Sequence, residues 1–262
     1  MIVDHKIIVE DSNACTGEFV IYSLLELYLR NQNNGVIFVA ASQSFSHYQA
    51  VLKKLTMIDS SQLVYLDQFG KPFDYNVFDN LPLSQAIPNT HTSKLPKKVQ
   101  FQQFTLVDSD QMLDKNFKSL FTKIEKSLKQ MQNDGKQVLV LVDNINIMIN
   151  GCYTKSELDF IEIMNEFTAI ADRDARMSVA IGVNRDLFDC ESTMDLDFYR
   201  EIKNSVFDSV YELNRNLSGY SRDVHGQLNI IRNKHNIGEQ SVKNVKFRLT
   251  ENKVELFEHF TI

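Results

Sequence analysis

The 262-residue sequence is poor in the features that mark secreted, disulfide-bonded or membrane proteins. It has only three cysteines, Cys15, Cys152 and Cys190, and they lie far apart. Their number and spacing form neither a disulfide framework nor a zinc-binding pattern, which suits a reducing compartment. No apolar run approaches the roughly 20 residues of a membrane-spanning helix. The first residues, Met1–Lys6, lack the apolar core of a signal peptide. We therefore expect a cytoplasmic or nuclear protein without a membrane segment.

The chain also lacks an excess of positive charge. Its 28 Lys and Arg residues are outnumbered by 34 Asp and Glu residues, which gives a net charge of -6. A protein with this balance has no general electrostatic attraction for nucleic acid or anionic membranes. The apolar fraction of 43% and the charged fraction of 24% are ordinary for a globular protein. Since this length can bury one large core, we expect a single domain over residues 1–262.

Proline is scarce as well, and it is concentrated in one segment. All four prolines lie between Lys71 and Lys97, and a basic cluster at Lys94, Lys97 and Lys98 ends the segment. A loop of this length in a compact domain is usually either functional or disordered. Two interpretations stay open for this Pro-containing insertion near residues 70–100: a surface insertion, or an arm that binds a partner.

The apolar residues predict alternating strands and helices. Continuous apolar runs indicate buried strands, and apolar residues at helical spacing indicate helices. The predicted strands are 7–9, 35–40, 63–66, 138–143, 178–183 and 210–213. The predicted helices cover 19–29, 51–55, 111–132, 155–171 and 198–206, and Ser44 or Ser46 can cap the second of them. Strands at 227–231, 245–249 and 253–256 follow, and Glu251-Asn252 joins the last two as an antiparallel hairpin. This order predicts a mostly parallel α/β sheet flanked by helices, with an antiparallel C-terminal edge.

The first strand–loop–helix unit has the layout of a phosphate-binding loop without its key residues. In a P-loop the pattern is G-x-x-x-x-G-K-[ST], and the aligned window runs from Ser12 to Phe19. Gly17 keeps the second glycine, whereas Glu18 replaces the lysine and Phe19 replaces the metal-binding hydroxyl. Two unit charges about 4 Å apart interact with about 4 kcal/mol at an effective dielectric of about 20. A glutamate in place of the lysine turns this attraction for phosphate into repulsion. We expect a degenerate P-loop that binds no nucleotide cofactor.

The strand that ends at Asp143 has the shape of a Walker B strand, in which the aspartate holds Mg²⁺ through water. A metal site needs other ligands, and the window at Ser12–Phe19 supplies neither the lysine nor the hydroxyl. We therefore favour a structural interpretation over a metal site. In this interpretation Asp143 is a degenerate Walker B residue that caps the loop at residues 144–146 and binds no metal.

Two longer motifs resemble one known family. The first is Gln-Ser-Phe-Ser-His-Tyr at residues 43–48, which follows a Phe-Val-Ala strand, and the second is Gly-Tyr-Ser-Arg-Asp-Val-His-Gly-Gln-Leu at residues 219–228. With the degenerate P-loop and Walker B layout, the chain resembles subunit six of the Elongator complex nearly from end to end. The resemblance implies a RecA-like fold without ATPase activity. It also implies a six-membered ring with subunits four and five, which binds tRNA and joins subunits one to three in modifying the wobble uridine (U34) of tRNA.

Within these motifs, the candidate interface or tRNA-proximal residues are Ser46, His47, Tyr48, Arg222, Asp223 and His225. Ser46 next to His47 is better explained as a cap and interface pair than as a nucleophile and base, because a catalytic triad needs a third orienting group and an oxyanion site.

In the second motif, alternate side chains of an extended chain share a face, so Asp223 can reach His225 and favour the charged form of its ring. Arg222 then needs a carboxylate or phosphate from elsewhere. An internal salt bridge and a contact to a ring neighbour or RNA both stay open.

Three classes of function can be compared with these observations. A non-catalytic assembly subunit without cofactor is the leading hypothesis. A RecA-like ATPase with an unusual site is opposed by Glu18 and Phe19. A stand-alone, recombinase-related nucleic-acid-binding protein is opposed by the acidic net charge, although the patch at Lys94–Lys98 can contribute within a ring.

Overall fold

The computed structural model describes residues 4–55, 62–68, 100–103, 113–151, 157–186, 196–216, 223–234, 239–250 and 253–258. Most of the predicted insertion near residues 70–100, including its lysine cluster, lies outside these residues, and so does Arg222. Among the described residues, no helix is both long and apolar enough to span a membrane.

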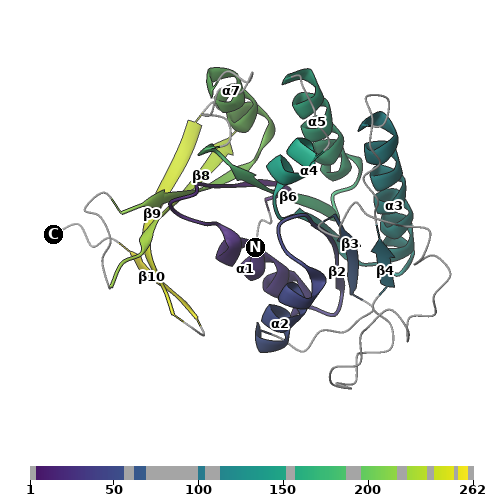
Figure 1. Cartoon of the computed structure of the whole chain (residues 1–262), viewed down its shortest axis with the longest axis horizontal. Helices are drawn as coiled ribbons and strands as arrows, with labels where there is room; N and C mark the ends of the chain where they lie inside the picture. Colours follow the sequence, from purple (N-terminus) through teal and green to yellow (C-terminus); the bar gives the residue numbers. More distant parts are fainter. Residues whose placement is uncertain are drawn as a thin grey trace.

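One ten-stranded sheet organises the described residues, in the order β10-β9-β8-β7-β1-β6-β5-β2-β3-β4 (Figure 1). Its strands are β1 (Lys6–Asp11), β2 (Asn34–Ala40), β3 (Leu63–Asp67), β4 (Gln100–Gln103), β5 (Gln137–Val142), β6 (Met177–Asn184), β7 (Ser209–Arg215), β8 (Gly226–Lys234), β9 (Glu239–Leu249) and β10 (Val254–Glu258). From β7 to β4, neighbouring strands run parallel, whereas β8, β9 and β10 pair antiparallel. The prediction of a mostly parallel sheet with an antiparallel C-terminal edge is confirmed.

Helices cover both faces of the sheet (Figure 1). On one face lie α1 (Glu18–Leu29) and α2 (Phe45–Leu55). On the other lie α3 (Leu113–Asn133), α4 (Ile145–Gly151), α5 (Glu157–Arg173) and α7 (Leu196–Val206). Each face has its own apolar core, because strands buried on both sides project alternate side chains into both layers.

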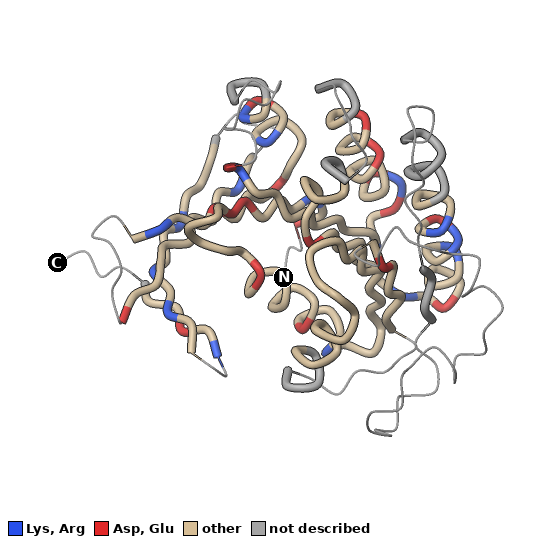
Figure 2. The backbone as a smooth tube through the Cα atoms, in the orientation of Figure 1, with Lys and Arg blue, Asp and Glu red and all other residues tan. Residues whose placement is uncertain are grey.

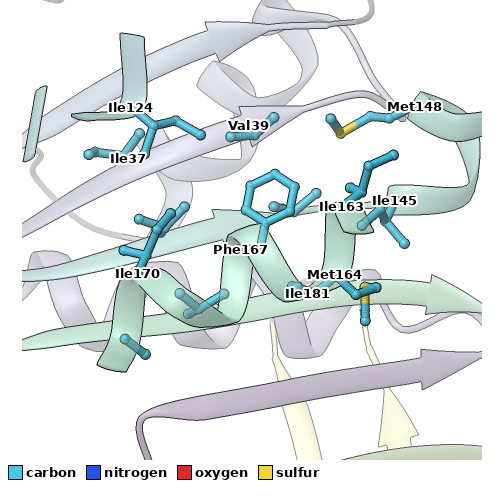
Figure 3. Close-up of a cluster of buried hydrophobic side chains, with 14 of the residues drawn as sticks. Ile37, Val39, Ile124, Ile145, Met148, Ile163, Met164, Phe167, Ile170 and Ile181 are labelled. Carbon is cyan, nitrogen blue, oxygen red and sulfur yellow. The ribbon is translucent and has the colours of Figure 1, made fainter. Parts of the chain in front are cut away.

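Helix α5 shows how the sequence pattern builds one of these cores. Its apolar residues recur every three or four positions and all are buried: Phe160, Ile163, Met164, Phe167 and Ile170. Figure 3 shows this stripe facing the strands, with Phe167 directed toward Val39 of β2. The predicted helix and its buried side are confirmed.

A glycine sets the distance between two strand ends at the carboxyl edge of the sheet. A Cβ atom built on Gly182 of β6 would lie 2.0 Å from the backbone oxygen of Asp143 at the end of β5. Only glycine fits so close an approach. The end of β6 can therefore pack directly against the segment that carries Asp143.

Two elements were not predicted. Strand β4, with the sequence Gln-Phe-Gln-Gln, pairs with β3 through its backbone and has no continuous apolar run. Helix α4 follows β5 directly, and Asn144 caps it, since the Asn144 Oδ1 accepts a hydrogen bond from the Ile147 N–H at 3.2 Å. Asparagine at this place in the sequence indicates a loop as readily as a cap, which is why α4 was missed.

Candidate functional site

The loop between β1 and α1 lies at the carboxyl end of the parallel strands, the edge at which α/β proteins bind ligands. It begins with a tight turn, in which the Ser12 N–H donates to the Cys15 carbonyl at 3.1 Å and the Cys15 N–H donates to the Ser12 carbonyl at 3.0 Å. The backbone N–H groups of Ser12 and Cys15 are thus bonded within the turn, whereas a P-loop directs its backbone N–H groups at phosphate.

Carboxylates of the chain itself accept the neighbouring amides. The Gly17 N–H donates to Asp11 Oδ2 at 2.8 Å, at the N-terminus of α1. The Asn13 N–H donates to Asp186 Oδ2 at 2.7 Å. A helix N-terminus after a loop is the usual position of a bound phosphate, because its free N–H groups and dipole favour an anion. In this chain Asp11 supplies that anion.

Acidic side chains surround the loop, whereas an anion-binding site needs positive charge or free N–H donors. Burial raises the pKa of Asp11 to about 6, against the hydrogen bond from Gly17, and the nearby carboxylates of Glu18 and Asp186 raise it further. Arg185 opposes this effect more weakly. Three carboxylates thus gather where a nucleotide would add more negative charge, so Coulomb repulsion disfavours a polyphosphate here.

Phe19, at the position of the metal-binding hydroxyl, has a packing role. Its ring lies 4.7 Å from the ring of Phe247 on β9, measured between centroids. The contact joins the start of α1 to the antiparallel part of the sheet. It also fills the position that would hold a magnesium ligand with apolar atoms.

Asp143 is partly buried, and three groups from other segments bind its carboxylate. The Ala41 N–H donates to Oδ1 at 2.7 Å and the Ser42 N–H to Oδ2 at 2.9 Å, and the Tyr48 hydroxyl also donates to Oδ2. Burial raises the pKa of Asp143 to about 6, while these hydrogen bonds and a smaller one from the Asn144 N–H hold it down. The interpretation of Asp143 as a cap of residues 144–146 needs correction, because its main partners lie in the β2–α2 loop and in α2.

The first motif forms the start of α2, where its residues have different environments. Ser44 is the cap, since its carbonyl accepts from the His47 N–H at 3.0 Å and its hydroxyl oxygen lies 3.4 Å from the same nitrogen. Ser46 and His47 are exposed, and His47 Nε2 lies 2.9 Å from the Tyr22 hydroxyl of α1. Tyr48 is only 2% exposed, so its place is in the core and not on an interface.

The second motif ties the start of β8 to β9. Asp223 lies 3.6 Å from Arg248 Nη1, a solvent-exposed pair of small energetic weight. His225 Nδ1 accepts a hydrogen bond from the Leu249 N–H at 3.0 Å. This donor comes from β9, and the sequence could not show that β9 is the neighbour of His225. The interaction of Asp223 with His225, and the charged ring that it would favour, stay a prediction.

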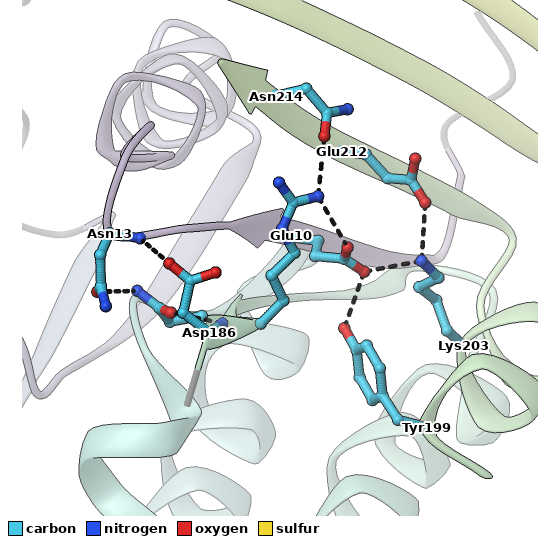
Figure 4. Close-up of polar contacts among 9 residues, drawn as sticks. Glu10, Asn13, Asp186, Tyr199, Lys203, Glu212 and Asn214 are labelled. Carbon is cyan, nitrogen blue, oxygen red and sulfur yellow. Dashed lines mark hydrogen bonds and ion pairs between the residues drawn. The ribbon is translucent and has the colours of Figure 1, made fainter. Parts of the chain in front are cut away.

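A buried ionic cluster at the ends of β1 and β7 was missed entirely. Figure 4 shows Lys203 of α7 between two carboxylates, 2.7 Å from Glu10 Oε2 and 2.7 Å from Glu212 Oε1. The Tyr199 hydroxyl donates to Glu10 Oε2 at 3.1 Å. Burial alone would lower the pKa of Lys203, but the charge of Glu10 and the hydrogen bonds to both carboxylates outweigh it and raise that pKa.

The only sequence signal for this cluster was Glu10 within a buried strand. Its partners lie about 200 positions away. Arg185 joins the cluster to β7, because its guanidinium lies 3.8 Å from Glu10 Oε1 and donates to Asn214 at 2.8 Å (Figure 4). These groups satisfy one another, and among the described residues no group of three or more His, Cys, Asp or Glu side chains could hold a metal ion.

Comparison with known proteins gives the family. A family model described as Elongation complex protein 6 matches residues 3–251. The chain belongs to this family. It is 28% identical over 224 residues to the Elongator complex protein 6 of Homo sapiens and 27% identical over 227 residues to that of Mus musculus, and each match covers 82% of this chain and 74% of the relative. Membership of the Elongation complex protein 6 family implies a role in the Elongator complex together with other Elongator subunits.

Solved structures agree on the fold. A KaiC-like protein from Pyrococcus horikoshii aligns with a TM-score of 0.52 at 11% identity, over 97% of this chain and 89% of that one. An uncharacterized protein from the same archaeon, in complex with an unknown peptide, aligns with a TM-score of 0.58 at 13% identity, over 98% and 92%. The Elongation complex protein 6 chain therefore has a RecA-like fold.

Proposed function

We propose that this protein is a non-catalytic subunit of Elongator, which forms a hetero-hexameric RecA-like ring with subunits four and five. The ring binds tRNA and supports modification of the wobble uridine (U34), in the cytoplasm or nucleus. Residues 1–262 form the single RecA-like domain of this subunit. One observation supports the proposal most. In this RecA-like fold, the N-terminus of α1, where a phosphate would bind, donates its Gly17 N–H to the carboxylate of Asp11.

The chemistry of the carboxyl edge supports a role without catalysis. Nucleotide hydrolysis needs a cation on the phosphates and a hydroxyl and aspartate on Mg²⁺. Glu18 and Phe19 replace the first two, and the carboxylate of Asp143 is bound to Tyr48 and two backbone amides. Recruiting Asp143 to a metal would break these bonds and leave buried donors unpaired, which is unfavourable.

The distribution of charge supports RNA binding by the ring and not by this chain alone. Lys and Arg are mixed with Asp and Glu over the described elements (Figure 2), and the net charge is -6. RNA binding depends on cations that neutralise phosphates, so an acidic subunit needs neighbours that supply them. The lysines at positions 94, 97 and 98 are candidates to contribute from this chain.

The exposed residues of the two motifs are the proposed contact positions. Ser46 and His47 lie at the exposed start of α2, next to Tyr22 of α1. Asp223 lies at the exposed start of the segment that leads to β8. Arg222 is proposed with them from its place in the motif. We propose that these positions meet a ring neighbour or lie near tRNA.

Reconstitution tests the proposal. Co-expression with subunits four and five should give a complex whose mass, from light scattering, equals two copies of each subunit. It should also raise the soluble yield, because faces buried in a ring are exposed in a lone subunit. The complex should retard tRNA in a gel-shift assay, whereas this chain alone should not. A monodisperse monomer that gains nothing from its partners would contradict the assembly role.

His47→Ala tests the contact surface within the same assay. The change removes an exposed side chain, so the melting temperature of the subunit should stay within experimental error. Ring formation or tRNA retardation should fall. The matched control is Gln130→Ala, an exposed position on α3 on the opposite face of the sheet. If His47→Ala behaves like Gln130→Ala in both measurements, His47 is not a contact residue.

A further inference from the structure

Outside the P-loop window, the partly buried carboxylate of Asp143 has an unusual set of hydrogen-bond donors. Its donors come from two different segments, the amides of Ala41 and Ser42 in the β2–α2 loop and the hydroxyl of Tyr48 in α2. Asp143 itself follows β5, about 100 positions away in the sequence. One side chain therefore joins the middle of the sheet to the loop and helix beside it.

Tyr48 links α2 to the core, next to Phe45, whose ring lies 4.8 Å from the ring of Tyr65. Among the described side chains of α2, residues 45–51, Tyr48 is the one that is buried. Its ring packs edge-to-face on Phe38 of β2, with centroids 4.7 Å apart, and lies 5.9 Å from the ring of Tyr22 on α1. The group that Tyr48 contacts therefore contributes to the position of α2.

The surroundings of Asp143 make this contact hard to replace. The groups that act on its charge are the Tyr48 hydroxyl and backbone amides, all of them uncharged. The charge of Asp143 also raises the pKa of two nearby tyrosines, Tyr22 of α1 and Tyr65 of β3, and both are neutral. A partly buried carboxylate whose partners are uncharged is stabilised by its hydrogen bonds, so losing one donor favours access of water.

We propose that Asp143 and Tyr48 form a pin that keeps α2, with the exposed Ser46 and His47, docked on the sheet. Releasing the pin lets the segment from Ala41 through the start of α2 open locally. The rest of the sheet stays folded, because β5 keeps its pairing with β2 and β6 and its place in both apolar cores. The hydrogen bond between Tyr48 and Asp143 thus helps to hold the surface that carries Ser46 and His47. Local openings of this kind are ordinary in folded proteins.

Hydrogen–deuterium exchange of the full chain, followed by mass spectrometry, tests the pin. Tyr48→Phe removes the hydroxyl and keeps the ring. Exchange in peptides covering residues 41–51 should become about tenfold to hundredfold faster, as expected for loss of one hydrogen bond to a charged group. Peptides covering β5 and β6 should exchange at the wild-type rate.

Tyr65→Phe is the matched control. Tyr65 lies in the same aromatic cluster, 6.2 Å from the ring of Tyr48, and is equally buried. Its hydroxyl has no hydrogen-bond partner among the described residues. The identical chemical change at this position should leave exchange of residues 41–51 unchanged. If Tyr65→Phe accelerates exchange as much as Tyr48→Phe does, the effect belongs to the cluster and the pin does not exist.

Asp143→Asn gives a second, independent measurement. The amide nitrogen of asparagine donates and cannot accept, so at least one of the three donors loses its partner while the side-chain volume is kept. Exchange of residues 41–51 should again accelerate selectively. Unchanged exchange in Tyr48→Phe, or equal acceleration in every peptide of that variant, overturns the proposal even if Asp143→Asn fails to fold.

Discussion

At the scale of single residues, the side chains at Ser12–Phe19 and their neighbours make contacts within the chain. Glu18 stands in the first turn of α1, where the helix dipole favours a carboxylate, and there it opposes phosphate. Phe19 packs on Phe247, and Asp11 accepts the Gly17 amide. Each side chain that replaces a catalytic group thus stabilises the loop and α1 in its present form.

The purified chain should not bind Mg-ATP, and Glu18→Lys should not create binding. The new lysine would stand beside Asp11, whose carboxylate already accepts the Gly17 amide, and Phe19 would still offer no metal ligand. Calorimetric titration measures this directly. Micromolar affinity in the wild-type chain would favour the ATPase alternative and contradict a subunit without nucleotide chemistry.

Lys203→Met should destabilise the protein strongly. Methionine keeps much of the length but removes the cation that lies 2.7 Å from both Glu10 and Glu212, and Arg185 stays 3.8 Å from Glu10. Breaking a buried ion pair in this way costs about 3–5 kcal/mol. Urea unfolding gives the change in the free energy of unfolding. The control, Lys126→Met on the exposed face of α3, should change it by less than about 0.5 kcal/mol. Equal effects would show that the cluster contributes nothing.

At the scale of helices and strands, the spacing of apolar residues predicted most elements. It predicted few of the contacts in the candidate site. Continuous apolar runs indicate buried strands wherever they occur, and α5 shows a clear helical period. The strand order could not be predicted, because β1 lies between β6 and β7, which follow it by about 170 and 200 positions. For the same reason the partners of Glu10 and His225 were not foreseen, since pairing across the sheet supplies them.

The pKa of Asp11 gives a pH dependence with a definite sign. Its pKa is about 6 in the folded chain and 3.8 in a free side chain, so the folded state holds the proton more tightly. The contribution of Asp11 to the free energy of unfolding therefore falls as pH rises from about 4 to about 6 and is level above that.

Urea unfolding of the wild type and of Asp11→Asn at pH 5.0 and 7.5 measures this term. Asparagine keeps an oxygen to accept the Gly17 amide and does not titrate. Relative to wild type, Asp11→Asn should be more stable at pH 7.5 than at pH 5.0 by about 1 kcal/mol. Asp143 is intact in both proteins, so its own titration cancels in the comparison. A difference of the opposite sign would contradict the assigned environment of Asp11.

At the scale of the whole molecule, the chain combines three properties. The fold is RecA-like, the family is Elongation complex protein 6, and the carboxyl edge of the sheet is filled by the chain's own side chains. Residue patterns and the two motifs were enough to predict the first two. The way in which the edge is filled needed the structure, because Asp11, Asp186, Glu18 and Phe247 come together only in the folded chain.

The central claim is that this chain acts as a non-catalytic part of Elongator. Native purification of the tagged protein from its own host, followed by quantitative mass spectrometry, tests it most directly. We predict recovery of subunits four and five in equal amounts with this chain, together with subunits one to three. Recovery of the chain alone, or with proteins unrelated to Elongator, would contradict the account.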